Sequence, residues 1–294
     1  MSFAEWEGIA VRIGRRTSLQ GKRILVTGAS SGIRRALAVQ LAAHGALPVL
    51  AARRGELLID VAEEIERAGH ARPAVITADL SQPGAAASLG EQALAAAGGA
   101  LDVLVNNAGA NLTGPQSVIA DAAHARKVFE VNVWSPLALT AAVLPAMLAA
   151  GTGTIVNVTS TVQSVPLPLL GYYAASKAAL AQATRSLRLE RAETPIRVLE
   201  VIPGSTDTAL RDIHEVPWNA SPPRTLPPVS PESSAAAIVR ALQRGHNRLV
   251  YPAYSLVPIE FPVIGRLIAA AAAKRVDTLG TLNAATGHER HHST

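Results

Sequence analysis

The sequence predicts an α/β fold in which helices cover both faces of one doubly wound, parallel sheet. Short runs rich in Val, Ile and Leu alternate with longer helical patterns along most of the 294 residues, as expected for parallel strands joined by helices. Hydrophobic residues make up 49% of the chain but aromatic residues only 3%, which suits buried parallel strands covered by helices of small residues. Glycines and polar residues follow these apolar runs, at the sheet edge where such folds bind ligands.

The expected strands are apolar runs that end at glycine, proline or polar residues. In order, they cover residues 23–27, 47–51, 74–78, 102–105, 154–158, 196–202 and 248–251. The helical patterns cover residues 35–44, 56–68, 85–97, 118–150, 174–189 and 233–244. The first helix stops at Gly45, and Pro136 and Pro145 are expected to bend or break the long fourth one. This order favours a single domain of three layers, helices, sheet and helices.

The expected sheet domain covers residues 21–252, and residues 1–20 form an arm outside it. Within the domain, the proline-rich segment 205–230 is expected to be a substrate-binding lid, with a disordered insertion as the alternative. Residues 253–294 form an apolar C-terminal extension that ends in a flexible tail. Its stretch 254–273 is expected to cap an apolar pocket or to form an oligomer interface, and membrane contact is the less favoured alternative.

Charge and composition exclude several classes of function. The formal net charge is +5, but the basic residues form no stripe of the kind that binds nucleic acid, so we expect no nucleic acid. An anionic cofactor or weak attraction to anionic lipid fits this charge. The chain has no cysteine, which excludes disulfides and thiolate metal sites and is compatible with the cytoplasm, where we expect the protein. Charged residues near the start interrupt any signal peptide, and no transmembrane helix is evident. We expect no metal site, since the histidines at 288, 291 and 292 lie in a terminal tail.

A glycine-rich turn follows the first expected strand at once. It reads Gly28-Ala29-Ser30-Ser31-Gly32-Ile33 and opens a helix. Backbone N–H groups at such a turn can hold a pyrophosphate, and the alternative is an ordinary strand–helix turn. The second strand ends at Ala52, where an NAD site would have an acidic residue, and Arg53 and Arg54 follow. Guanidinium groups suit a ribose 2′-phosphate, so the sequence favours NADP(H), although a solvated arginine pair is the alternative.

A tyrosine and a lysine lie four residues apart in the Ala-rich helical segment after the fifth strand. Tyr173 and Lys177 therefore share one helix face, whereas Tyr172 points elsewhere. The lysine charge favours phenolate and lowers a tyrosine pKa that is normally about 10, which makes proton transfer easier. Ser160 follows the strand end and is placed to hydrogen-bond a substrate oxygen. Taken alone, a Tyr–Lys pair at this spacing is usually a solvated surface pair.

Taken together, the motifs resemble the classical short-chain dehydrogenase/reductase family and its Rossmann-type fold over about residues 20–252. They are Thr27-Gly28-x-x-x-Gly32, Asn106-Asn107-Ala108-Gly109, Asn132, Ser160, Tyr173-x-x-x-Lys177 and Pro203-Gly204-x-x-x-Thr208. The resemblance implies that Tyr173 is the general acid or base, that Lys177 also holds the nicotinamide ribose, and that Ser160 orients the substrate oxygen. It further implies that Asn132 bends its helix around a water that relays protons to Lys177.

The resemblance also implies which residues bind the cofactor. The turn residues Gly28, Ser30, Ser31, Gly32 and Ile33 would face the pyrophosphate, and Arg53 and Arg54 the 2′-phosphate. Asp79 and Leu80 would meet the adenine, while Asn106, Ala108 and Gly109 would line the adenosine side. Pro203, Gly204, Thr206 and Thr208 would lie along the nicotinamide carboxamide, and Tyr173 and Lys177 would also contact the cofactor. Family members commonly form homodimers or homotetramers, which we expect here through the helices after Val118 and Gly171.

One position departs from the family pattern. The last glycine of Thr-Gly-x-x-x-Gly-x-Gly is Arg34 in this chain, and its side chain would either pair with phosphate or obstruct the cofactor. The expected function is an NADP(H)-dependent carbonyl reductase or alcohol dehydrogenase for a small hydrophobic ketone, aldehyde or secondary alcohol. The alternatives are a 3-oxoacyl-thioester reductase and, because of Arg34, a catalytically idle NADP-binding or scaffold protein.

Overall fold

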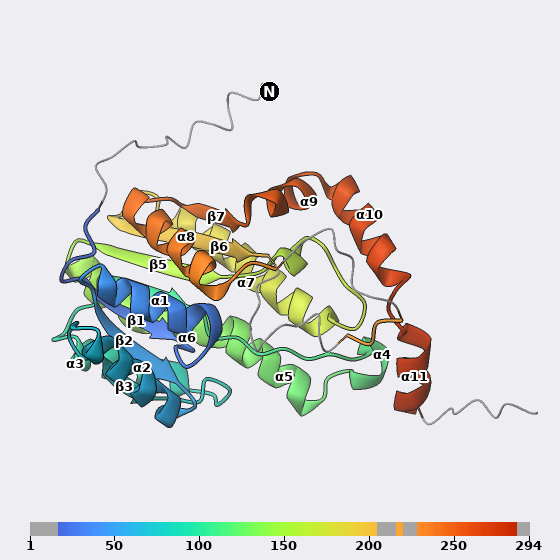
Figure 1. The fold of residues 1–294 in the computed structure, drawn as a ribbon, viewed down its shortest axis with the longest axis horizontal. Helices are drawn as coiled ribbons and strands as arrows, with labels where there is room; N and C mark the ends of the chain where they lie inside the picture. The colour runs from blue at the N-terminus through green and yellow to red at the C-terminus, as the bar shows by residue number, and fades with distance from the viewer. Residues whose placement is uncertain (1–16, 205–215, 220–227, 287–294) are drawn as a thin grey trace, which may run out of the picture.

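A computed structural model describes residues 17–204, 216–219 and 228–286. In these residues, parallel strands form one seven-stranded sheet in the order β3-β2-β1-β4-β5-β6-β7 (Figure 1). The strands are β1 (Arg23–Thr27), β2 (Leu47–Ala52), β3 (Ala74–Thr77), β4 (Val103–Asn106), β5 (Gly153–Val158), β6 (Ile196–Pro203) and β7 (Arg248–Tyr251). The strand order reverses between β1 and β4, which is the switch point where doubly wound sheets bind their ligands. The predicted fold class is confirmed.

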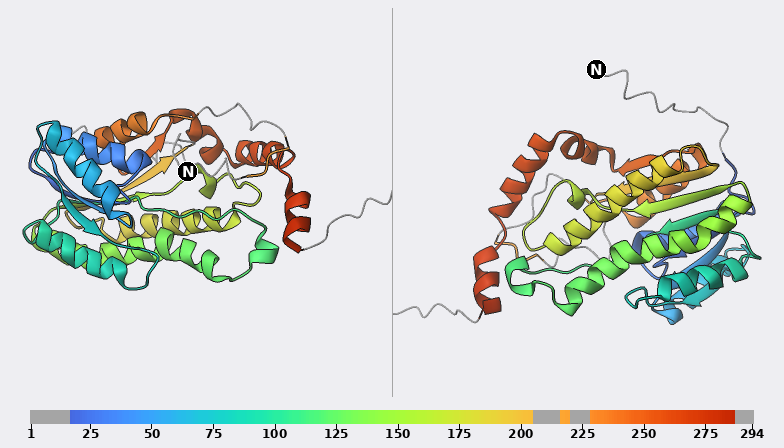
Figure 2. Two further views of the ribbon diagram at one scale, coloured as in Figure 1. Left: turned by 60° about the horizontal axis from the view of Figure 1, so that its bottom comes forward. Right: turned by 180° about the vertical axis from the view of Figure 1, so that it is seen from behind.

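Helices cover both faces of the sheet. One face carries α1 (Gly32–Ala43), α2 (Gly55–Arg67) and α8 (Pro231–Arg244). The other carries α3 (Ala85–Ala96), α6 (Ser135–Ala149) and α7 (Gly171–Glu190), as the view from behind in Figure 2 shows. Successive strand residues supply the two cores in turn: Ile24 and Val26 of β1 pack with the first group, and Leu25 packs with the second. Burial on both faces explains why the strands read as continuous apolar runs.

The helical region predicted over residues 118–150 is divided into several elements in the structure. The chain forms α4 (Gln116–Ile119), a break at Ala120 with φ 47°, α5 (Ala123–Phe129), the π-helical turn η2 (Glu130–Trp134) and then α6. Neither proline ends a helix: Pro136 lies at the start of α6, which continues directly from the π turn, and Pro145 lies inside α6. The irregularity falls on the π turn that contains Asn132.

The extension after β7 is helical in its described part. It forms η5 (Ala253–Ser255), α9 (Leu256–Glu260), α10 (Pro262–Ala273) and α11 (Thr278–Thr286), the last of which the sequence did not predict. In Figure 1 these helices lie at one end of the domain, away from α2 and α3. A β-bridge between Trp218 and Val276 ties the segment 216–219 to this extension. Most of the predicted lid and the tail histidines lie outside the described residues.

Candidate cofactor and catalytic site

The glycine-rich turn between β1 and α1 has a backbone that only glycine accepts easily. Gly28 has φ 71°, and a Cβ there would lie 3.0 Å from Cα of Ala108 and 2.7 Å from Cδ of Arg34. Gly32 and Ile33 open α1. The turn therefore lies directly against the loop after β4, a contact that the sequence does not show, and its predicted pyrophosphate role stays a prediction.

Thr27 fastens this turn to the β4 loop. Its buried Oγ1 donates to the carbonyl of Val105 at 3.2 Å and accepts from the N–H groups of Asn107 and Ala108, both at 3.0 Å. The sequence predicts no role of its own for Thr27, although Thr27 directly precedes Gly28. Its role follows from strand pairing between β1 and β4, which the sequence does not show.

A cleft of about 580 Å³ opens over the carboxyl ends of β1, β2, β3 and β4. It is lined by nine of the residues predicted to bind the cofactor: Gly28, Ser30, Ser31, Arg53, Arg54, Asp79, Leu80, Ala108 and Gly109. Arg34 lines the cleft with them. The structure thus brings together residues from four strand ends that lie far apart in the chain.

The charged groups of the cleft are mostly cationic. Arg34, Arg53 and Arg54 line one part, and Lys127 of α5 lines another beside the side chain of His124. Sequence reasoning missed both residues of α5. The Arg54 Nη2 donates to Ser30 Oγ at 3.4 Å. This set of groups suits a ligand with several phosphates.

Asp79 is the acidic group of this cleft. Burial acts to raise its pKa, but hydrogen bonds from Ser81 and Gln82 and the charge of Arg53 outweigh burial, so the pKa lies below its ordinary value. Asp79 is therefore a carboxylate at neutral pH and can only accept hydrogen bonds.

Asn106 does not line the cleft. Its buried amide Nδ2 donates to Oδ1 of Asn157 at 2.9 Å and lies within 3.4 Å of Oγ1 of Thr140, between the sheet and α6. The side chain thus holds β4 against β5 and α6. Of the four residues in this motif, only Ala108 and Gly109 line the cleft.

Tyr173 and Lys177 lie at the carboxyl end of β5. Both are buried in the first two turns of α7, with 7% and 4% exposed. Nζ of Lys177 lies 5.9 Å from the centre of the Tyr173 ring and donates to the carbonyl of Val158 at 2.9 Å. Val158 is the last residue of β5, and Ser160 follows two residues later, with its Oγ accepting from the N–H of Val162 at 3.4 Å. Three of the four predicted catalytic residues, Ser160, Tyr173 and Lys177, therefore lie near the end of β5.

Asn132 is fully buried and uses its side chain for structure. Its Oδ1 accepts from the N–H of Ala110, and its Nδ2 donates to the Ala110 carbonyl, both at 2.8 Å, and to Oγ of Ser176 at 2.9 Å. These bonds fix the loop after β4 to α7. The predicted water relay to Lys177 would therefore have to use the main chain of Asn132 in the π turn.

The end of β6 closes the predicted nicotinamide side. Pro203 is the last residue of β6, and the N–H of Gly204 donates to the carbonyl of Tyr251 at 2.8 Å. A Cβ on Gly204 would lie 2.7 Å from Oγ of Ser255, so η5 packs closely on this turn. Thr206 and Thr208 lie outside the described residues.

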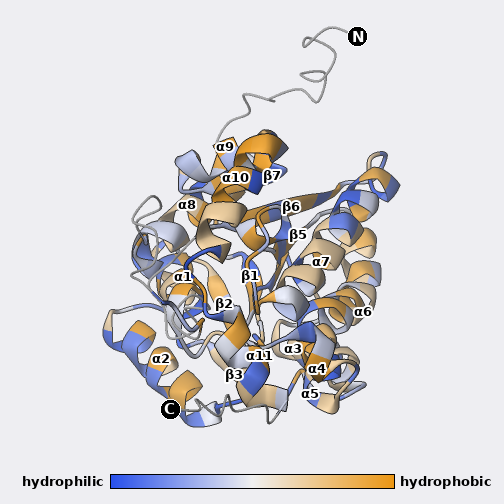
Figure 3. Cartoon of the chain, turned by 90° about the vertical axis from the view of Figure 1, so that its right-hand side faces the viewer, coloured by the Kyte–Doolittle hydropathy of each residue, from blue (hydrophilic) through white to orange (hydrophobic). Residues whose placement is uncertain are grey.

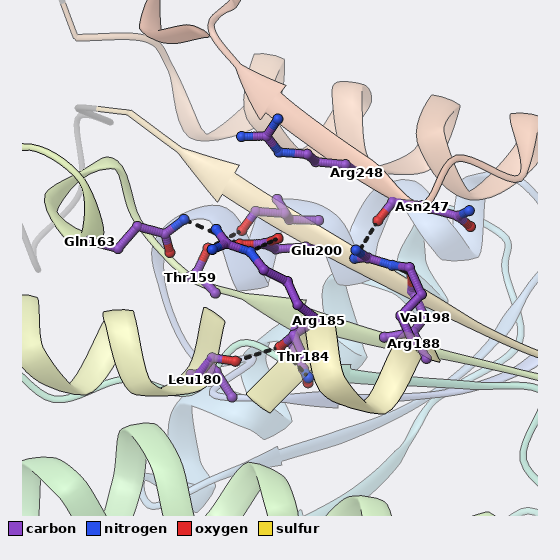
Figure 4. A network of polar contacts seen from close by, with 12 residues as sticks. Thr159, Gln163, Leu180, Thr184, Arg185, Arg188, Val198, Glu200, Asn247 and Arg248 are labelled. Carbon is purple, nitrogen blue, oxygen red and sulfur yellow. Dashed lines mark hydrogen bonds and ion pairs between the residues drawn. The ribbon is translucent and has the colours of Figure 1, made fainter. Parts of the chain in front are cut away.

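A buried carboxylate holds α7 and the turn after Ser160 to β6 (Figure 4). Glu200 of β6 is 1% exposed. It accepts a hydrogen bond from Nε2 of Gln163 at 3.2 Å, in the 3-10 turn η3 (Thr161–Gln163), and pairs with Nε of Arg185 at 3.6 Å. Arg188 of α7 adds bonds to the carbonyls of Val198 and Asn247. The sequence alone does not reveal this network, because its members are far apart in the chain.

Arg185→Ala is expected to lower the free energy of unfolding by about 2 kcal/mol, because Glu200 would stay buried without its cationic partner. The double variant Arg185→Ala/Glu200→Gln is expected to recover much of this loss, since the buried charge is then gone. Urea unfolding of the wild type, the two single variants and the double variant measures both effects. Losses that simply add would show that the two side chains do not interact.

The short chain dehydrogenase family model matches residues 22–215 of the chain. A short chain dehydrogenase of Pseudocercospora fijiensis is 38% identical over 193 residues, which are 65% of this chain and 62% of that protein. The chain thus spans less than two thirds of the length of this relative.

Solved structures share the fold. A short chain dehydrogenase/reductase from Burkholderia phymatum, in complex with NAD, matches 83% of this chain and 93% of its own with a TM-score of 0.73 and 24% identity. A metagenomic short-chain oxidoreductase, in complex with NADP, matches 80% of this chain and 98% of its own with a TM-score of 0.66 and 32% identity.

Proposed function

The chain belongs to the short-chain dehydrogenase/reductase family of oxidoreductases, and we propose that it interconverts a carbonyl and an alcohol by hydride transfer with NADP(H). The observation that carries the proposal is the position of Tyr173 and Lys177 at the end of β5, where the Lys177 ammonium is bound to the carbonyl of Val158. A buried phenol next to a buried ammonium is suited to proton transfer. Ser160 follows on the same strand end.

The side chains have distinct roles in the proposed reduction. The bound nicotinamide would supply a hydride to the carbonyl carbon. Ser160 would hydrogen-bond the carbonyl oxygen and stabilise the negative charge that develops there. Tyr173 would give its proton to that oxygen, and the charge of Lys177 would stabilise the resulting phenolate. In the oxidation of an alcohol, Tyr173 would take the proton back.

NADP(H) is proposed rather than NAD(H) because cations stand where an NAD site has an acid. Arg53 and Arg54 follow Ala52 at the end of β2 and line the cleft. A 2′-phosphate at this strand end would find two guanidinium groups that form planar, charge-assisted hydrogen bonds. The metagenomic relative in complex with NADP supports this choice.

Arg34 is proposed to bind phosphate rather than to obstruct the cofactor. Its side chain extends over Gly28 and forms part of the cleft wall, and the cleft keeps about 580 Å³ beside it. Its guanidinium therefore adds positive charge where the turn would hold a pyrophosphate. If Arg34 binds phosphate as proposed, it gives no reason to expect an idle protein.

Arg34→Ala is expected to raise the Kd for NADPH about tenfold, because one charge-assisted contact to phosphate is lost. Titration of NADPH fluorescence measures the change. Arg35→Ala is the matched control, since Arg35 is exposed and pairs with Glu64 of α2. Tighter NADPH binding by Arg34→Ala would show that the side chain obstructs the site.

The substrate is proposed to be a small hydrophobic ketone, aldehyde or secondary alcohol. Apolar residues surround the segment that follows Ser160: Leu169 and Leu170 pack with Val216 and Val276, and Val165 lies against α10. Burial of apolar substrate atoms there would favour binding.

A substrate panel tests the proposed function. NADPH binding is measured first, and NADPH consumption is then followed with apolar ketones, aldehydes and a 3-oxoacyl thioester. Turnover of ketones or aldehydes is the expected result. Exclusive turnover of the thioester would identify a 3-oxoacyl-thioester reductase instead, and tight NADPH binding without any turnover would indicate an idle protein.

We also propose that the protein acts in the cytoplasm as a homodimer or homotetramer. Trp134 of η2 and Leu189 of α7 are 57% and 77% exposed, on the helices expected to form the interface. Large exposed apolar side chains of this kind are common in subunit contacts.

A further inference from the structure

The C-terminal helices carry half of the strongly exposed large apolar residues in the part of the chain that the structure describes. Of fourteen such residues, seven lie between positions 254 and 267 and are 38–66% exposed: Tyr254, Leu256, Val257, Phe261, Val263, Ile264 and Leu267. Figure 3 shows the orange, hydrophobic colour over much of α9 and α10 at one edge of the molecule. Single exposed apolar residues need no explanation, but a cluster of this size marks an interaction surface.

α10 buries its small residues and exposes its large apolar ones, whereas an ordinary surface helix buries its large apolar residues. Its buried positions are the small residues Gly265 and Ala272, while Phe261, Val263 and Leu267 face outward. A Cβ on Gly265 would lie 2.7 Å from the carbonyl oxygen of Pro258 and 3.5 Å from Val165. Small residues thus let α10 pack closely on α9 and on the loop after Ser160, and the large apolar residues are left for another partner.

We propose that this outer face of α9 and α10, residues 254–267, binds the surface of a membrane that contains anionic lipids. By composition and length the two helices together could cross a membrane, but they are bent by 101° and their small residues are packed on the domain. This geometry fits helices that lie in the interface rather than span it. The other apolar helical stretch, Ala123–Ala149, is partly buried, because α6 packs on the sheet.

The charges around this face favour lipid over a second copy of the chain. Arg266 is exposed between Ile264 and Leu267, and Lys274 is exposed at the end of α10. The carboxylate of Glu260 already pairs with Arg248. A two-fold interface centred on this face would bring the Arg266 side chains of both copies close to each other. Lipid phosphates complement these side chains instead, and the long stems reach from the apolar surface to the headgroups.

Vesicle binding tests the proposal on the full chain and does not depend on enzymatic activity. Wild-type protein is expected to sediment with vesicles of phosphatidylcholine and phosphatidylserine, and less with phosphatidylcholine alone or at high salt. Phe261→Ser/Leu267→Ser is expected to lower binding to the mixed vesicles about tenfold or more, since two large apolar groups no longer enter the interface. Arg266→Glu is expected to lower binding to the mixed vesicles but to leave binding to phosphatidylcholine vesicles unchanged.

Ile59→Ser is the matched control, because Ile59 is an exposed apolar residue on α2, far from this face, and it should bind vesicles like wild type. Circular dichroism and thermal unfolding confirm that each variant is folded. Wild-type protein that binds neither vesicle, or a folded Phe261→Ser/Leu267→Ser variant that binds like wild type, would overturn the proposal. If light scattering shows a wild-type dimer that the variant does not form, and the wild type binds no vesicles, the face would belong to a contact with a second copy instead.

Discussion

Tyr173→Phe is expected to lower kcat roughly 10²- to 10⁴-fold, which is the usual contribution of a general acid or base. The reason is that phenylalanine keeps the ring next to Lys177 but has no proton to give to the substrate oxygen. NADPH affinity should change little, because the phosphate contacts proposed for the cleft come from other residues and phenylalanine keeps the ring of Tyr173. Steady-state kinetics and NADPH titration of the same preparation measure both quantities.

The neighbouring tyrosine provides a matched control for this experiment. The Tyr172 hydroxyl donates to the carbonyls of Ala120 and Gln116, outside the site. Tyr172→Phe should therefore keep its kcat within a few-fold of wild type. Equal losses in the two variants would mean that the ring environment, and not the Tyr173 proton, limits the reaction.

Arg53→Ala/Arg54→Ala is expected to raise the Kd for NADPH roughly 10²- to 10⁴-fold, since two charge-assisted contacts of about 1.5–3 kcal/mol each would be lost. The Kd for NADH should change only a few-fold, because NADH has no 2′-phosphate. Fluorescence titration with both dinucleotides gives the ratio of affinities.

Arg67→Ala controls for a general change in charge, because Arg67 is an exposed residue at the far end of α2. Its affinity for both dinucleotides should equal that of wild type. A double variant that loses NADH and NADPH binding by the same factor would remove the case for a 2′-phosphate site.

The sequence predicted the sheet well because buried parallel strands have a simple pattern. β5 and β6 are mostly apolar, since both sheet faces are covered, with Asn157 and Glu200 as buried polar exceptions, and glycine or proline marks one end of each strand. The cleft residues Gly28, Arg53 and Asp79 were predictable for the same reason: each follows a strand, and all parallel strands of one sheet end at the same edge.

Features that depend on distant contacts were not predictable. The π turn around Asn132 is accompanied by side-chain bonds to Ala110 and Ser176, which come from other parts of the chain. The inward direction of Asn106 depends on Asn157 of β5. The position of the Arg34 side chain depends on its approach to Gly28, which no local pattern encodes. The local sequence therefore predicted the positions of the motifs but not the side-chain contacts between them.

Transfer of deuterium from NADPH labelled at both C4 positions to a hydrophobic ketone or aldehyde tests the central claim most directly. We expect one deuterium at the carbinol carbon of the alcohol product in mass spectrometry, and none with Tyr173→Phe in the same reaction time. Product alcohol without deuterium, or full transfer by Tyr173→Phe, would contradict hydride transfer at the site formed by Ser160, Tyr173 and Lys177.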